Sequence, residues 1–191
     1  GTYVMSDLNA EIDAVNAANA GTGWSFARVD GGRSLGGSMG FETAGQWNFG
    51  LGVERLDATT RASDASGTLE YRLGANAWRV FGEYALRPIG RSTFFVGGAI
   101  GVVQENGKVI QSATGYAPLR FNTYGSDPSF EGYVGGSWWV TPHFAVTSTV
   151  GYRQAKVKQV RLEGAAFTMS NGETLSLDFS GPSARIGIKF A

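Results

Sequence analysis

Short turns in this chain are repeatedly flanked by aromatic rings, and this feature restricts the possible folds more than any other. Each ring begins or ends a stretch of roughly ten residues in which apolar side chains alternate with small or polar ones. Because side chains of a β-strand alternate between its two faces, these rings should share one face and one end of their strands. The rings are those of Phe41, Trp47, Tyr84, Phe94, Trp138, Phe144 and Phe190. Such a girdle is typical of a transmembrane β-barrel, since amphipathic rings settle at the level of the lipid headgroups.

The alternation predicts the strands. In the stretch 47–54, Trp47, Phe49, Leu51 and Val53 are large and apolar, and the residues between them are polar or glycine. The predicted long strands are 33–43, 46–57, 69–86, 93–104, 129–140, 143–157 and 174–190. Within two of them the apolar positions change parity, near 75–77 and at Gly181-Pro182. A β-bulge at each place is the predicted cause.

Strand length and composition agree with a membrane-spanning barrel. The eight steps from Phe144 to Tyr152 correspond to about 26 Å of strand, or about 20 Å along the membrane normal after tilting. The 191 residues suit one main domain, and with no cysteine the chain has no disulfide framework. The formal net charge of zero gives no argument for nucleic acid, and no apolar run is long enough for a helical span. We expect an exported protein whose signal peptide has been removed.

The N-terminal residues differ from the rest. Leu8, Ile12 and Val15 recur at helical spacing after Ser6 and Asp7, which predicts a short amphipathic helix over about 6–19. The expected domains are therefore 1–22, with this helix, and 23–191, the barrel. The helix is expected to rest on the barrel mouth or pack against a neighbour, with a lumen plug or an oligomerisation arm as alternatives.

The number of strands is a separate question. Bacterial single-chain barrels use an even number of strands, and seven long ones have been found. The preferred eighth strand is 23–30, where Trp24 and Phe26 alternate with smaller residues before the turn at 30–32. A continuous first strand that begins near residue 23, with unusual closure, is the alternative.

These features together resemble the small bacterial outer-membrane β-barrel proteins, a group that includes outer-membrane proteins A, X and W. The resemblance covers about 23–190 and rests on the alternating strands, the short turns 43–46 and 141–143, the longer loops near 58–68, 104–128 and 158–173, and the terminal run 185–190. It implies an all-β, antiparallel, up-and-down transmembrane barrel of eight strands in the bacterial outer membrane. A fold of this kind implies little about activity.

Alternation also assigns charged residues to the inner face. An eight-stranded interior is just wide enough for side chains to fill, so these charges should pair and block the lumen. The expected network is Glu54, Arg79, Glu83, Glu131, Arg153 and Arg185, and the same reasoning places Glu42, Asn48, Glu70, Arg72, Asn76, Asp178 and Lys189 inside. A path for protons or ions along these residues is the alternative.

Nothing in the sequence indicates catalysis. The only histidine, His143, lies in a predicted tight turn without a recognisable serine partner, and one histidine without cysteines gives no metal-ligand cluster. We therefore expect no enzyme, no catalytic residue, no metal and no cofactor.

The longest predicted loop, 104–128, is the candidate interaction surface. It carries Tyr116, Arg120, Phe121 and Tyr124 among small polar residues, a composition typical of binding surfaces. A hydrophobic mini-core within the loop is the alternative. The expected function is structural or surface-interacting, with outer-membrane lipid and a surface ligand or protein as partners and a homo-oligomer as a possibility. The alternatives are a narrow transporter of small apolar compounds, and a self-assembling subunit whose apolar outer face packs against protein.

Overall fold

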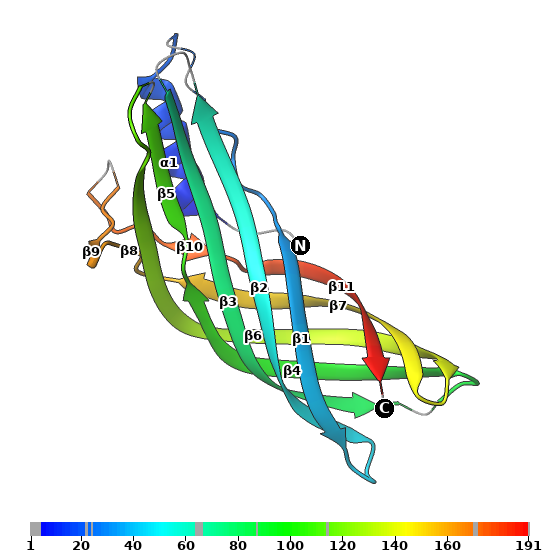
Figure 1. The fold of residues 1–191 in the computed structure, drawn as a ribbon. Coiled ribbons are helices and arrows are strands. Elements are labelled where there is room, and N and C mark those ends of the chain that lie inside the picture. Colours follow the sequence, from blue (N-terminus) through cyan, green and yellow to red (C-terminus); the bar gives the residue numbers. More distant parts are fainter. Residues whose placement is uncertain are drawn as a thin grey trace.

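A computed structural model describes residues 5–21, 23, 25–63, 67–86, 88–113, 115–169 and 172–190. These residues form one antiparallel sheet and one helix, α1 (Ser6–Ala18) (Figure 1). The strands are β1 (Arg33–Glu42), β2 (Trp47–Ser63), β3 (Gly67–Ala85), β4 (Ser92–Glu105), β5 (Lys108–Ala113), β6 (Leu119–Thr141), β7 (Phe144–Val157), β8 (Arg161–Leu162), β9 (Ala165–Ala166), β10 (Leu177–Asp178) and β11 (Gly181–Phe190). The predictions of an all-β antiparallel architecture and of one short N-terminal helix are confirmed.

The strands follow one another as a meander. The order in the sheet is β1-β2-β3-β4-β6-β7, and both β10 and β11 pair with β7. β5 continues the line of β4, because both lie between β3 and β6, so β3, β4, β6 and β5 form a closed ring of hydrogen-bonded strands. The seven predicted long strands thus correspond to seven positions in the sheet. Among the described residues, β1 pairs only with β2 and β11 only with β7, so no pairing between β1 and β11 closes the sheet.

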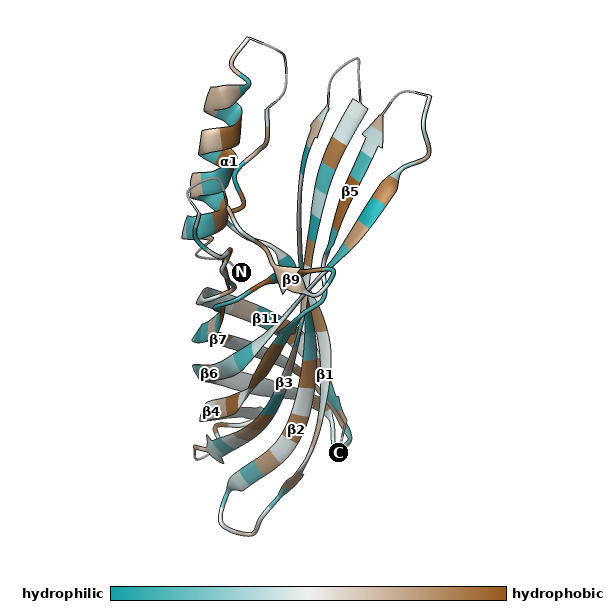
Figure 2. Ribbon diagram, turned by 90° about the vertical axis from the view of Figure 1, so that its left-hand side faces the viewer, coloured by the Kyte–Doolittle hydropathy of each residue, from teal (hydrophilic) through white to brown (hydrophobic). Residues whose placement is uncertain are grey.

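The sheet is curled so that distant strands meet on one face. The carboxylate of Glu54 on β2 accepts a hydrogen bond of 2.9 Å from the guanidinium of Arg185 on β11, the last strand. We call the face that carries Glu54 and Leu56 the inner face, and the face that carries Trp47 and Leu51 the outer face. The half of the sheet that α1 covers is the upper half, and the half with the turns 43–46 and 142–143 is the lower half (Figures 1 and 2).

Apolar and polar side chains exchange faces partway along the strands. In the lower part of β2, the outward residues 47–53 are apolar and alternate with Asn48, two glycines and Glu54 on the inner face. Above Glu54 the pattern reverses: Leu56, Ala58 and Ala62 are buried on the inner face, and Arg55, Asp57, Thr59 and Arg61 point outward. Figure 2 shows hydrophobic and hydrophilic residues alternating along β2. The lower half is therefore apolar outside, and the upper half is apolar inside.

This exchange, and not a bulge, explains the parity changes in the sequence. β2 and β3 pair in one unbroken register from Trp47↔Tyr84 to Ser63↔Thr68, so no residue is inserted near 75–77. β10 and β11 likewise continue one register against β7, from Leu177↔Val157 to Phe190↔Phe144. Both predicted bulges are wrong.

Four residues that alternation assigned to the inner face lie on the outer face instead. They are Glu70, Arg72, Asn76 and Asp178, as their registered partners on β2 and β7 show. Arg72 donates to Glu70 at 2.5 Å on the outer surface of β3. Above the exchange, apolar residues such as Leu73 and Ala75 occupy the inner-face positions of the strands, so the polar residues that alternate with them point outward.

α1 closes the upper inner face as the lid of a small hydrophobic core. Leu8 and Ile12 are 2% and 3% exposed and belong to the same cluster as Leu56, Val103 and Phe179, which come from three positions across the sheet. The segment 158–180 adds Val160, Met169, Leu175 and Leu177 to this cluster. The helix begins after Met5, and no side-chain hydrogen bond caps its N-terminus.

The segment 25–30 is held by asparagines and forms no strand. Asn16 accepts from the backbone N–H of Phe26 at 2.8 Å and donates to its carbonyl at 3.0 Å, and Asn9 binds Val29 in the same two-sided way at 2.8 and 3.1 Å. Side-chain amides of α1 therefore satisfy the backbone groups that a neighbouring strand would otherwise pair. The predicted eighth strand at 23–30 is absent over residues 25–30, and Trp24 lies outside the described residues.

We expect Asn9→Ala to detach this segment from the helix. Asn9 is 3% exposed, so the substitution leaves the buried N–H and C=O of Val29 without partners, which should cost about 1–3 kcal/mol. Urea titration would measure the loss, and hydrogen exchange should show faster exchange of the Val29 amide. Asp13→Ala, which removes an exposed ion pair with Arg28, is the control and should change stability little. Unchanged protection of Val29 in the Asn9 variant would contradict this role.

Candidate functional site

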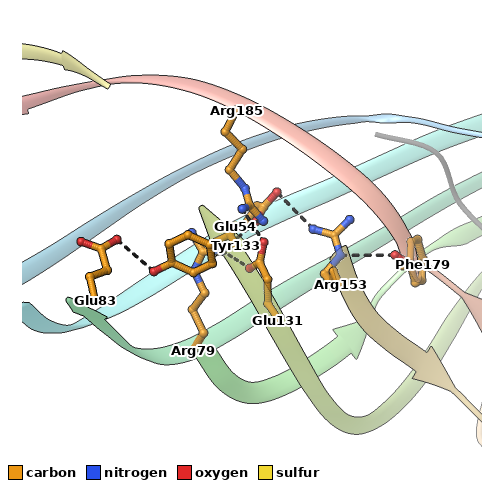
Figure 3. A network of polar contacts seen from close by, with 8 residues as sticks. All are labelled: Glu54, Arg79, Glu83, Glu131, Tyr133, Arg153, Phe179 and Arg185. Carbon is orange, nitrogen blue, oxygen red and sulfur yellow. Dashed lines mark hydrogen bonds and ion pairs between the residues drawn. The ribbon is translucent and has the colours of Figure 1, made fainter. Parts of the chain in front are cut away.

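Charged side chains from five strands meet on the inner face at the level of the exchange. Glu54 on β2 accepts from Arg79 on β3 at 3.3 Å, from Arg153 on β7 at 3.3 Å and from Arg185 on β11 at 2.9 Å. Glu131 on β6 accepts from Arg79 at 2.7 Å and from Arg185 at 2.5 Å. We call these five residues the charge cluster (Figure 3). Each arginine sits on its strand at the parity that points inward, so the fold brings together residues up to 131 positions apart in the chain.

Glu83, the sixth residue of the predicted network, lies beside the cluster without an ion pair to it. Its carboxylate accepts from the hydroxyl of Tyr133 at 2.9 Å (Figure 3). It also accepts from the side-chain amide of Asn48 at 2.8 Å. Sequence reasoning missed Tyr133, although it shares the parity of Glu131 on the same strand. Its neighbours Gly132 and Val134 point outward. Before the strand register is known, a tyrosine at this position cannot be told apart from the outward aromatic residues of the pattern.

Burial makes the cluster rigid. Glu54 and Arg153 are 3% and 5% exposed, and the Nε of Arg153 also donates to the carbonyl of Phe179 at 3.2 Å. Every carboxylate oxygen of Glu54 and Glu131 accepts at least one bond from an arginine. Ion pairs held in this way tie β2, β3, β6, β7 and β11 together. They form a structural cross-link and not a row of free titratable groups, which argues against the alternative of an ion path.

The predicted girdle residues lie on the outer face at the lower ends of their strands. Apart from half-buried Phe144, they are between 36% and 76% exposed. Neighbouring strands bring the rings into contact: the ring centroids of Trp47 and Tyr84 are 5.1 Å apart, and those of Phe144 and Phe190 are 5.6 Å apart. Above the girdle, the outer face of the lower half continues with exposed apolar side chains, among them Leu51, Val80, Ile100, Val134, Val150 and Ile186.

The predicted loop 104–128 is largely a β-hairpin. β5 and the upper end of β6 pair from Lys108↔Asn122 to Gln111↔Leu119 and extend the sheet above the core. Tyr116, in the turn, is 81% exposed, and Arg120 and Tyr124 are exposed on β6, whereas Phe121 is half-buried on the other face. The hairpin therefore does not bring all four candidate residues onto one face, and replacing 105–127 by a short linker would remove sheet as well as loop.

One carboxyl in the upper half is buried without full pairing. Glu105 is 2% exposed; its Oε1 accepts from the backbone N–H of Gly107 and from the hydroxyl of Thr123, both at 2.6 Å, whereas Oε2 has no hydrogen-bond partner. Burial raises the pKa of the Glu105 carboxyl, and the bonds from Thr123 and Gly107 and the charge of Arg55 oppose this only in part.

We expect Glu54→Ala to destabilise the protein by about 3–5 kcal/mol, because it leaves buried arginines without a counter-charge. Denaturant titration in detergent or vesicles would measure this loss. The control is Arg28→Ala, which removes an exposed ion pair with Asp13 and should cost no more than about 1 kcal/mol. Removing Glu54 and Arg153 together should cost less than the sum of the single changes. Equal effects of Glu54→Ala and Arg28→Ala would show that the cluster is not a structural cross-link.

Glu105→Gln tests the buried carboxyl through pH. A group whose pKa is raised by folding holds its proton more tightly in the folded state, so its contribution to stability is lost as pH rises through the raised pKa. The variant should match the wild type below the pKa of the unfolded carboxyl, where Glu105 is protonated in both states. Its advantage should grow as pH rises from there to the raised pKa of the folded state, and stay constant at higher pH. Unfolding titrations over a pH series would measure the difference, and a difference that is constant across the whole series would reject the assignment.

Within the described ranges no group of histidine, cysteine, aspartate and glutamate is arranged to hold a metal ion, and no helix is both long and apolar enough to span a bilayer. His143 lies in the turn between β6 and β7, at the lower end of the sheet. Comparison with protein-family models, curated proteins and solved structures finds no match for this chain.

Proposed function

We propose that the chain forms the wall of a bacterial outer-membrane β-barrel, with the lower half of its sheet in the lipid and the upper half outside it. The observation that carries this proposal is the exchange of apolar and polar faces partway along the strands. An apolar outer face with a polar interior suits lipid, and a polar outer face with an apolar core suits water. The lower half of the sheet would expose apolar side chains in water, and the upper half would expose polar side chains in lipid.

The height of the apolar outer face supports the proposal. On β4 the outward residues from Phe94 to Val102 are apolar or glycine over eight steps, about 26 Å of strand and about 20 Å along the normal after a tilt of about 40°. This is close to the roughly 25 Å apolar band of outer-membrane barrels. The girdle marks one boundary of the band, and Arg55, Gln104 and Lys156 mark the other.

The interior supports a structural or surface-interacting role over transport. The charge cluster joins strands on opposite sides of the curled sheet at mid-height, and Phe81, Phe95 and Tyr133 point inward below it. A continuous water-filled path would have to pass this cluster. The hairpin of β5 and β6, with Tyr116 and Tyr124 exposed, is the surface we propose for contact with a ligand or protein outside the membrane.

A second candidate function, a subunit that assembles with further copies, is favoured by the state of the edges. All ten residues of β1 are exposed, and β1 pairs only with β2 among the described strands. Backbone groups in lipid must be satisfied, so the edges β1 and β11 need pairing within or between chains when the sheet is embedded. Sedimentation in detergent distinguishes the two arrangements by mass.

A matched pair of substitutions on β2 tests membrane insertion. Leu51 and Thr59 both point outward, one below and one above the exchange. In lipid vesicles, Leu51→Arg should destabilise the folded protein by about 2–4 kcal/mol, whereas Thr59→Arg should change its stability little because Thr59 faces water. Folding titrations with vesicle flotation measure both effects.

The same experiment separates the alternatives. If the purified protein is soluble and folded without detergent and does not float with vesicles, the membrane proposal is rejected. If it floats and Leu51→Arg is tolerated as well as Thr59→Arg, the assigned level of the membrane is wrong.

A further inference from the structure

Two grooves lie one above the other on the outer face, and together they have the form of a lipid site. The lower groove, of ≈ 580 Å³, is lined by outward apolar residues, among them Phe49, Val80, Ile100, Phe130 and Tyr152. The upper groove, of ≈ 650 Å³, is lined by polar residues that include Gln104, Tyr124, Ser126, Lys158 and Arg161. The first lies within the proposed apolar band and the second just above it.

Three glycines form the floor of the lower groove. Gly82, Gly98 and Gly132 stand next to each other on β3, β4 and β6, and Phe49 and Tyr152 end the same row on β2 and β7. The ring of Phe49 lies over Gly82, where an added Cβ would meet it at 3.3 Å, so Gly98 and Gly132 form the open part of the trough between larger apolar residues. A Cβ at Gly132 would meet nothing within 4 Å, so the trough is open space at that point.

The upper groove offers cations without ion pairs. Lys158 and Arg161 are both exposed, and neither takes part in an ion pair among the described residues. The lining also includes two acidic residues: Asp127, which accepts from the backbone N–H of Lys158 at 2.8 Å, and buried Glu105, which accepts from Gly107 and Thr123. Tyr124, which pairs with Arg161 across β6 and β8, adds a hydroxyl on the same side.

The grooves are aligned along β6. Ser126 lines the upper groove and Phe130 the lower, and the four steps of strand from one residue to the other span about 13 Å. Only the row that contains Trp78, Val102 and Pro128 separates them. An anionic group in the upper groove would thus stand directly above an apolar chain in the lower one.

We propose that this outer surface binds one anionic membrane lipid, with its phosphate at Lys158 and Arg161 and an acyl chain over Gly98 and Gly132. The inference rests on the proposed membrane position of the sheet. The exposed cations Lys158 and Arg161 favour an anionic headgroup. The lower groove lies at the level of the apolar band, so its occupant in a membrane is an acyl chain.

Trp78 provides the reporter for a test. The protein is inserted into phosphatidylcholine vesicles that contain a small fraction of either brominated phosphatidylglycerol or brominated phosphatidylcholine, and quenching of Trp78 is obtained by difference from Trp78→Phe. The wild type should be quenched more strongly by the brominated phosphatidylglycerol. Lys158→Ala and Arg161→Ala should each lower this preference by about fivefold, and Arg120→Ala, an exposed cation outside the groove, should leave it unchanged.

Substitutions that fill the trough test whether an acyl chain binds there. Gly132→Leu should reduce quenching by both brominated lipids, and Gly98→Ala, whose Cβ would meet only the Glu131 carbonyl at 3.4 Å, should reduce it less. Gly37→Leu is the matched control, because Gly37 is an outward glycine of β1 with equally open space. Free glycerol 3-phosphate should not displace the lipid, since it lacks the chain.

Vesicle flotation separates this inference from the proposed function. A protein that floats but shows no preference for phosphatidylglycerol, or whose quenching is unaffected by Gly132→Leu, overturns the lipid site and leaves the membrane position standing. Full displacement of the lipid by glycerol 3-phosphate overturns the role of the acyl chain. A protein that does not float overturns both.

Discussion

The exchange of apolar and polar faces partway along the strands is the constraint on which the rest of this structure depends. Below the exchange, the outward side chains of β2 are Trp47, Phe49, Leu51 and Val53; above it they are Arg55, Asp57, Thr59 and Arg61. The sheet itself continues in register through this level. Two different solvents for the two halves of one sheet would select this pattern, because a buried polar face and an exposed apolar face are each costly in water.

The charge cluster and the upper core follow from this constraint. At the exchange, the inner face changes from polar to apolar, and Glu54 and Arg153 lie within two positions of Leu56 and Ala155, which are fully buried. The cluster therefore seals the core from below, while α1 closes it from one side. Its ion pairs between β2 and β11 also hold the curl of a sheet whose edge strands are not paired with each other.

The sequence predicted the strands well because alternation is a local property. The regions expected at 46–57, 93–104 and 143–157 correspond to β2, β4 and β7. The exchange could not be recognised locally, because a change of parity has the same appearance whether a residue is inserted or the apolar face changes. Only the unbroken pairing of β2 with β3 separates the two, and it moves Glu70 and Arg72 to the outside. The charge cluster was foreseen for residues below the exchange, where alternation alone gives the correct face.

The segment 25–30 shows a second limit of local pattern. Its alternation is that of a strand, but Asn9 and Asn16 of α1 bind the backbone of Val29 and Phe26 in place of a neighbouring strand. No residue within 25–30 indicates these partners, which lie up to 20 residues earlier in the chain. The periodicity of a sequence cannot show that the backbone groups of a segment are paired by the side chains of a helix.

A cysteine scan along β2 would test the exchange most directly, and the chain contains no native cysteine to interfere. Spin labels placed singly from 47 to 63 in the vesicle-inserted protein are compared for collisions with oxygen, which concentrates in lipid, and with a water-soluble nickel complex. The account predicts that odd positions 47–53 favour oxygen, odd positions 55–63 favour nickel, and even positions 56–62 are reached by neither. Odd positions that keep one preference along the whole strand would contradict it.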